Sequence, residues 1–308
     1  VYKRQVRMMC AAFPKITISQ WSAFDIDPEA QELNQVPQLN LTQLDTLTKF
    51  PAGYGLCVTN PPYLAKNSAA RKGIDIDFGP FQDIYEVALD KMLRSCPWVA
   101  AIIPESFITR DRFRKRLEFV ISLTHNMFDD TEFPVCLAVF SPSNQTDCEI
   151  WRNERLLGTY ADLILAREAV LKQSRSGIFT FNDPLGSLGL YAVDMTKGPS
   201  IRFVPGNEIA PEEIKHTSRA ITRISTNSLP PAVRLGDHNI IARANQVLDL
   251  YRRSTHDVFL TSFKGLREDG EYRRRLDWNT ATRILATAVL DCDPNMAPLL
   301  LSDPTMPW

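Results

Sequence analysis

An amide and a phenol ring follow a short apolar run, in the order Asn60-Pro61-Pro62-Tyr63. The run at 56–59 is typical of a short buried strand. Neither proline can extend a strand or a helix, so the pair ends the run and stiffens the corner after it. The side-chain oxygen of Asn60, the carbonyl of Pro61 and the ring of Tyr63 therefore lie at the end of the strand. In open α/β sheets, ligands bind at this end of the strands.

These groups suit the activation of an amine on an aromatic ring. Such an amine is a poor nucleophile because its lone pair is delocalised into the ring. Asn60 Oδ1 and the Pro61 carbonyl could accept its hydrogens and localise the lone pair, where positive charge develops in the transition state. Tyr63 could stack on the ring plane. The alternative interpretation is a Pro-Pro turn with an incidental asparagine.

Asn-Pro-Pro-Tyr resembles the catalytic tetrapeptide of amino-group methyltransferases that use S-adenosylmethionine, chiefly the N6-adenine DNA methyltransferases. The longer segment 60–68 also resembles modification enzymes of type II restriction–modification systems. The resemblance covers roughly residues 15 to 142. It implies that Asn60, Pro61, Pro62 and Tyr63 form the catalytic site.

Two acidic residues precede the tetrapeptide in the order that this family shows. The resemblance implies that Asp25 binds the ribose of S-adenosylmethionine and that Ile26 covers its adenine. Asp45 is implied to contact the adenine amino group. The alternatives are local: Asp27 is also placed to cap a helix, and Asp45 to cap a loop.

The family's first strand ends in a glycine-rich loop that lets the backbone approach the cofactor. The first glycine of this chain is Gly53, and residues 6–13 have the pattern of a helix end. We therefore expect the glycine loop to lie upstream of Val1.

Alternating strand and helix patterns predict an α/β domain over 1–150, with a mostly parallel, Rossmann-like methyltransferase sheet and helices on both faces. Its strand ends would bring Asp25, Asp45 and Asn60 to one crevice. The expected strands lie at 16–24, 39–45, 56–59, 99–103 and 133–140, and the expected helices at 81–94 and, basic and amphipathic, at 110–123.

Three further residues are candidates for substrate binding. Lys66 and Arg71 lie in a polar stretch at 64–73, predicted as a loop that could neutralise phosphates. Phe133 is a candidate second aromatic clamp for the target base, although a core position is the stronger expectation. An ordinary solvated loop is the alternative for 64–73.

Residues 151–308 predict a helical linker, with a helix at 154–173, and a mixed α+β target-recognition and DNA-binding region. Its basic residues are interleaved with Phe263, Tyr272 and Trp278, which suits contacts to phosphates and base edges. These cations are Lys215, Arg219, Arg223, Arg234, Arg243, Arg252, Arg253, Lys264, Arg267, Arg273, Arg274 and Arg275. Acids are common in the same region, so a solvated charged surface is the alternative.

Composition sets limits on these interpretations. The 308 residues contain 35 Lys and Arg against 36 Asp and Glu, a net charge of -1, so DNA binding has to rely on local basic patches. Six dispersed cysteines and four histidines favour neither a metal site nor a disulfide framework. No apolar run has the length of a membrane span, and we expect a cytoplasmic protein without a membrane partner.

The sequence therefore predicts a site-specific DNA methyltransferase that moves a methyl group from S-adenosylmethionine to N6 of a flipped adenine. Double-stranded DNA is the expected partner, with a cognate restriction endonuclease as a further one. A protein glutamine-N5 methyltransferase is an alternative, but the extension of about 150 residues is large for that compact class. A non-enzymatic DNA-binding remnant is the other alternative.

Overall fold

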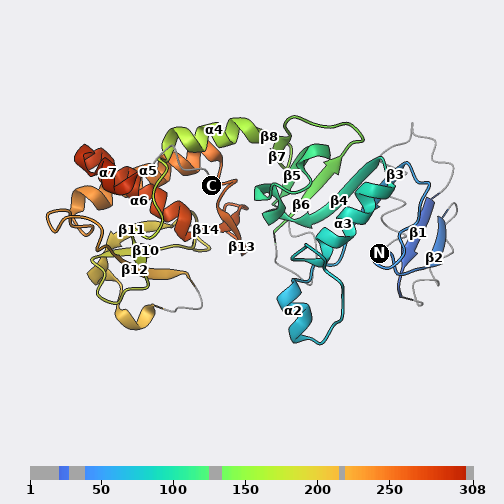
Figure 1. Cartoon of the computed structure of the whole chain (residues 1–308), viewed down its shortest axis with the longest axis horizontal. Coiled ribbons are helices and arrows are strands. Elements are labelled where there is room, and N and C mark those ends of the chain that lie inside the picture. Colours follow the sequence, from blue (N-terminus) through green and yellow to red (C-terminus); the bar gives the residue numbers. More distant parts are fainter. Residues whose placement is uncertain (1–20, 28–38, 125–133, 215–218, 303–308) are drawn as a thin grey trace. The chain divides into compact units, whose positions relative to one another are not determined.

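The computed structural model describes residues 21–27, 39–124, 134–214 and 219–302. The chain divides into two compact units, Val1–Ala101 with Phe140–Pro142, and Ile102–Val139 with Ser143–Trp308. Figure 1 labels their elements. The helix end expected at 6–13 and the candidate clamp Phe133 lie outside the described residues. Within those residues, every helix is too short or too polar to cross a lipid bilayer.

Two parallel strands open the described part of the first unit. Strands β1 (Trp21–Asp25) and β2 (Leu39–Gln43) pair in parallel, with Asp25 opposite Gln43. Both strands were predicted. They form a sheet of their own among the described residues, so the alignment of Asp25, Asp45 and Asn60 along one crevice stays a prediction.

The strand before the tetrapeptide is β3 (Leu56–Thr59), and it pairs in parallel with β4 (Trp98–Pro104). The strand was predicted, but its expected burial is wrong, because Leu56 and Val58 are exposed. Between β3 and β4 lies α3 (Ile84–Ser95), which confirms the helix expected at 81–94. Its apolar face includes Ile84, Val87 and Leu89, which are buried. This is the strand–helix–strand order that the sequence predicted.

The prediction of a polar loop at 64–73 is wrong in one respect, because this stretch contains the short helix α2 (Lys66–Arg71). Alanine and arginine are good helix formers, and Ala69 is fully buried against Phe78, Ile84 and Val87. Ala69 therefore anchors this polar segment in the apolar core.

A six-stranded sheet has the order β3-β4-β6-β5-β7-β8 and is mostly parallel. Its remaining strands are β5 (Leu117–Leu123), β6 (Val135–Phe140), β7 (Glu149–Arg152) and β8 (Arg155–Thr159). Strands β5 and β7 run parallel, and β8 returns antiparallel to β7. The placement of helices on both faces stays a prediction.

The basic helix predicted at 110–123 is wrong. The chain instead forms the 3-10 turns η2 (Glu105–Thr109) and η3 (Arg114–Arg116) and then strand β5. Residues 117–123 are rich in β-branched and aromatic side chains, and Leu117, Val120 and Ser122 are buried in the sheet. The basic residues at 110–116 therefore suggested a helix in a stretch that ends in a buried strand.

The helix α4 (Tyr160–Val170) is shorter than the predicted 154–173, because residues 155–159 pair as β8. Thr159 ends that strand and caps the helix, since its Oγ1 accepts a hydrogen bond from the Asp162 amide.

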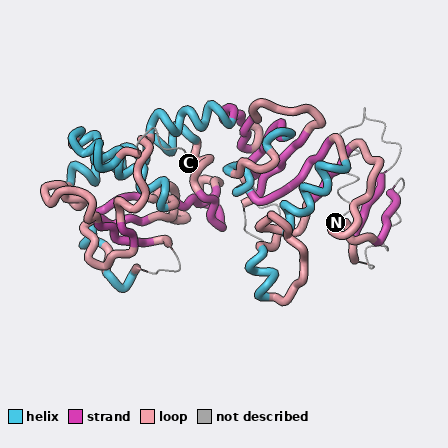
Figure 2. The backbone as a smooth tube through the Cα atoms, viewed as in Figure 1, coloured by secondary structure: helices cyan, strands magenta, loops and turns pink. Residues whose placement is uncertain are grey.

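The rest of the second unit is mixed α+β (Figure 2). One antiparallel sheet contains β9 (Thr180–Phe181), β10 (Leu188–Tyr191), β11 (Arg202–Pro205) and β12 (Ile221–Ser225). A hairpin consists of β13 (Thr261–Leu266) and β14 (Tyr272–Arg275), and the helices are α5 (His238–Thr255), α6 (Trp278–Cys292) and α7 (Ala297–Leu300). Short 3-10 turns are η4 (Gly206–Glu208), η5 (Pro211–Glu213) and η6 (Pro294–Met296).

Candidate active site

The tetrapeptide 60–63 follows β3 directly and forms a braced corner. Asn60 is exposed, Pro61 is buried and Pro62 is exposed. Tyr63 is half-buried, and its hydroxyl donates to Asn60 Oδ1 at 2.5 Å. Its ring meets that of Tyr85 edge to face, with the centroids 6.4 Å apart. The structure therefore brings the amide and the phenol together at the end of the strand, with the amide facing solvent.

Asp83 fixes the chain that leaves this corner. Its Oδ1 accepts hydrogen bonds from the Leu64 amide at 3.0 Å and from the Tyr85 amide at 3.3 Å, so one carboxylate caps α3 and holds the residue after Tyr63. The Ile84 amide also donates to the Leu64 carbonyl at 3.1 Å. Burial raises the pKa of Asp83, against the lowering effect of these amide donors.

Sequence reasoning did not identify Asp83. An aspartate directly before the apolar periodicity of a helix is a capping signal, but its bond to Leu64 joins residues 19 positions apart. That part of its role follows only from the fold.

Cys57 lies in β3, three residues before Asn60, and is not prepared to act as a nucleophile. Burial, and then the neighbouring Cys96, raise the pKa of its thiol to about 12. The reactive form of cysteine is the thiolate, so this thiol stays protonated near neutral pH. The corner therefore suits hydrogen-bond activation of an incoming amine better than covalent catalysis by Cys57.

The residues predicted to hold the cofactor's nucleoside end β1. Asp25 is half-buried, its Oδ1 accepts from the Asp27 amide at 3.0 Å, and its carbonyl accepts from the Leu44 amide at 2.8 Å. Ile26 has 66% of its surface exposed. A carboxylate beside an uncovered aliphatic side chain suits a ribose and a flat purine, so these two residues fit the nucleoside of S-adenosylmethionine.

Asp45 lies just past the end of β2 and takes the local role weighed for it. Its Oδ1 accepts from the Leu47 amide at 2.9 Å, and its carbonyl accepts from the Lys49 amide at 3.0 Å. Because β1 and β2 pair at Asp25 and Gln43, Asp25 and Asp45 occupy the same end of this small sheet. The hydrogen bond from the Leu47 amide uses one of the two carboxylate oxygens of Asp45.

The two candidate phosphate-binding cations flank α2. Lys66 begins the helix and Arg71 ends it, and both are exposed. Arg71 folds back on its own helix, with Nε donating to the Asn67 carbonyl at 3.2 Å and Nη2 lying 3.4 Å from Ser68 Oγ.

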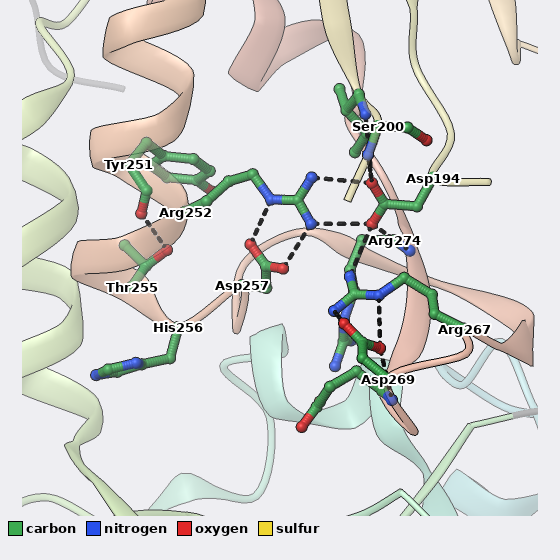
Figure 3. A network of polar contacts seen from close by, with 12 residues as sticks. Asp194, Ser200, Tyr251, Arg252, Thr255, His256, Asp257, Arg267, Asp269 and Arg274 are labelled. Carbon is green, nitrogen blue, oxygen red and sulfur yellow. Dashed lines mark hydrogen bonds and ion pairs between the residues drawn. The ribbon is translucent and has the colours of Figure 1, made fainter. Parts of the chain in front are cut away.

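Several arginines of the C-terminal basic cluster form internal ion pairs. Asp194 is fully buried and receives both terminal nitrogens of Arg252 at 2.9 Å and Nη1 of Arg267 at 3.1 Å (Figure 3). Arg252 also reaches Asp257 at 2.7 Å, and Arg267 reaches Asp269 at 2.9 Å. For Arg252 and Arg267 this outcome differs from both sequence interpretations, a DNA contact or a solvated surface.

Arg274 is likewise internal. It has 2% of its surface exposed and pairs with the buried Glu105 at 2.6 and 3.1 Å. The hydroxyls of Ser122 and Ser262 donate to the same carboxylate. Burial raises the pKa of Glu105, but Arg274 and the two serines outweigh it and hold this pKa well below its usual range. Glu105 therefore remains a carboxylate that joins η2, β5 and the hairpin.

No cluster of three or more His, Cys, Asp or Glu side chains in the described parts of the chain is arranged to hold a metal ion.

No family model matches the chain, and no curated protein matches it. Solved structures do. One is a Listeria monocytogenes protein described as a class I S-adenosylmethionine-dependent methyltransferase, with a TM-score of 0.33, 12% identity, and coverage of 46% of this chain and 53% of that chain. Another is a type I restriction–modification methyltransferase subunit from Streptococcus thermophilus, with a TM-score of 0.33, 18% identity, and coverage of 47% and 44%. A further one is the M protein of the type I restriction enzyme EcoKI, with a TM-score of 0.34, 14% identity, and coverage of 49% and 40%.

These neighbours are methyltransferases. The chain spans between 40% and 53% of their length. At these TM-scores and identities the likeness assigns no reaction to this chain.

Proposed function

We propose that this chain is part of an S-adenosylmethionine-dependent methyltransferase that acts on the N6 amino group of adenine in DNA. The observation that carries the proposal is the exposed Asn60 side chain, held by Tyr63 at the end of β3. A hydrogen-bond acceptor and an aromatic ring, joined by two prolines, are the groups that a weakly nucleophilic aromatic amine requires.

In this proposal Asn60 Oδ1 and the Pro61 carbonyl accept hydrogen bonds from the two N–H groups of the amine. An amide oxygen has two lone pairs, so Asn60 can receive the amine while it keeps or exchanges the Tyr63 hydroxyl. The ring of Tyr63 then packs against the base, which must leave the duplex to reach the corner. Bound S-adenosylmethionine supplies the methyl group, and Asp25 and Ile26 hold its nucleoside.

DNA is the favoured acceptor because the second unit adds a large mixed α+β region to the unit that carries the corner. Adenine also offers the flat ring on which Tyr63 can stack. As the modification arm of a restriction–modification system, the protein would have a cognate endonuclease as a further partner.

The test measures transfer of a labelled methyl group to three acceptors: adenine-containing duplex DNA, the same DNA without adenine, and a glutamine-containing peptide. The full reading frame is used, with Asn60→Ala as the matched variant. We expect transfer to adenine-containing DNA alone, and loss of that transfer in Asn60→Ala. Transfer to the peptide alone would replace this proposal with the glutamine-N5 reaction.

Normal turnover by Asn60→Ala would remove the catalytic role of the corner. The non-enzymatic alternative predicts DNA binding with no heat on titration of S-adenosylmethionine into the same protein, which isothermal calorimetry measures.

A further inference from the structure

The residues that follow η2 form the basic segment 110–116. It reads Arg-Asp-Arg-Phe-Arg-Lys-Arg, five cations and one acid, a local charge of +4 in a chain whose net charge is -1. Arg110, Arg112 and Lys115 are exposed, whereas Arg114 is half-buried. A patch of this charge density attracts polyanions even when the whole chain is close to neutral.

The segment is anchored at its centre. Phe113 adopts a left-handed backbone, with φ at 71°, which is uncommon for a bulky residue. Its ring stacks on that of Phe107, with the centroids 6.4 Å apart and the planes at 23°. This contact holds the turn at Arg112 and Phe113, where the Arg112 side chain is exposed.

Arg114 provides the second anchor. Its Nη2 donates to the Ile108 carbonyl at 2.6 Å, and its guanidinium lies 3.4 Å from the centre of the Tyr160 ring. It also pairs with Asp111, the single acid of the segment, at 3.6 Å. Past this anchor, the Lys115 carbonyl accepts from the Gln145 amide at 2.7 Å.

Arg110, Arg112 and Lys115 are therefore exposed on a backbone that these contacts hold in place. Binding to a fixed backbone loses less conformational entropy than binding to a mobile loop. The segment also leaves the carboxyl end of β4, the end at which α/β sheets bind ligands.

We propose that the segment 110–116 binds the phosphate backbone of a nucleic acid through Arg110, Arg112 and Lys115. The choice of duplex DNA as the nucleic acid rests on the proposed function. Contacts of this kind set affinity and register without reading the base sequence. They also release condensed counterions, so binding weakens as salt rises.

The experiment measures binding of a short fluorescent DNA duplex across a salt series. The triple variant Arg110→Ala, Arg112→Ala, Lys115→Ala is compared with a matched variant that removes the same charge from exposed cations elsewhere in the unit. That control is Lys172→Ala, Lys197→Ala, Arg155→Ala, since these three residues are also exposed. Thermal unfolding of both variants checks that they fold.

We expect the triple variant in segment 110–116 to bind DNA about tenfold or more weakly. The slope of log affinity against log salt should become shallower by about 2 to 3, because three phosphate contacts are lost. The matched control should keep the wild-type slope. The double variant Arg110→Lys, Arg112→Lys should also keep it, since phosphate attraction needs the charge. Equal affinity and slope for the triple variant in segment 110–116 and its control would overturn the proposal.

Methyl transfer by the same proteins separates this proposal from the proposed function. DNA binding that depends on segment 110–116, without methyl transfer, would support the phosphate site and remove the methyltransferase assignment. If the wild-type protein methylates DNA but its DNA binding does not depend on segment 110–116, the methyltransferase assignment would be supported and the phosphate site overturned. A wild-type protein that binds no DNA at low salt would overturn both the phosphate site and the proposed function. Binding to anionic lipid vesicles in place of DNA, dependent on segment 110–116, would overturn the choice of a nucleic acid as the partner.

Discussion

The Tyr63 hydroxyl donates to Asn60 Oδ1 at 2.5 Å, so the side chain expected to stack on a substrate ring is bonded to the side chain expected to polarise its amine. The bond holds the Asn60 oxygen in one direction. It also means that an incoming amine meets an acceptor that is already oriented.

Tyr63→Phe should keep the ring and lose the bond to Asn60. We expect the rate of methyl transfer to fall about fivefold, which corresponds to the loss of one hydrogen bond of roughly 1 kcal/mol. Steady-state kinetics on the methyl acceptor measures this, and the effect should appear in kcat more than in KM.

Tyr63→Ala removes both the bond and the ring. Its loss should exceed that of Tyr63→Phe by a further factor of about 10, since stacking a base on an aromatic side chain contributes roughly 1 to 3 kcal/mol. Comparable activity of the two variants, measured on the same acceptor, would show that the ring does not contact the substrate.

Asp83→Ala should loosen the corner, although Asp83 itself is not expected to contact the substrate. It removes the cap of α3 and the acceptor for the Leu64 amide, and we expect a loss of about 1 to 2 kcal/mol in the free energy of unfolding. Asp83→Asn keeps an acceptor oxygen and should lose less. Asp90→Ala, in the same helix and paired with Arg94 near the surface, is the control that should stay close to wild type in a urea titration.

Glu105→Leu should be strongly destabilising, because it leaves the Arg274 guanidinium buried without its partner. Removing one member of such a pair costs about 3 to 5 kcal/mol. The double variant Glu105→Leu, Arg274→Met should recover much of that loss in urea unfolding, since no buried charge remains. Single and double variants of equal stability would show that the pair does not interact as described.

The Glu105 pKa also predicts an acid response. Its folded pKa, about 2, lies below the ordinary value of 4.5. The unfolded chain therefore binds the proton more readily. The stabilisation by this carboxylate is complete above about pH 4.5 and is lost as the pH falls toward 2. Glu105→Gln should show a flatter decline than wild type over that interval, measured by thermal unfolding at a series of pH values.

Local sequence patterns predicted the elements around the corner well. The apolar run at 56–59 and its two prolines gave β3 and its end, and the periodicity of 81–94 gave α3. The same reasoning failed at 117–123, where basic residues just before the segment suggested a helix face while its β-branched residues entered the sheet.

The partners of the charged residues were beyond local patterns. Glu105 and Arg274 are 169 positions apart, and nothing near either residue indicates the other. The run 273–275 therefore looked like a basic surface, although Arg274 is buried and Arg273 donates to the Asp194 carbonyl at 2.7 Å. Charge counts indicate how many cations a chain has, and only the fold shows which of them are already neutralised.

The Asp194 carboxylate bonds to residues 58, 73 and 80 positions further along the chain. Each of these contacts closes a long loop, and the entropy of closure has to be lost before the ion pairs form. Such contacts form late and slowly in folding. The second unit should therefore gain its final stability in one concerted step, after synthesis has passed Arg274, and no shorter nascent piece of it contains the complete set of charges.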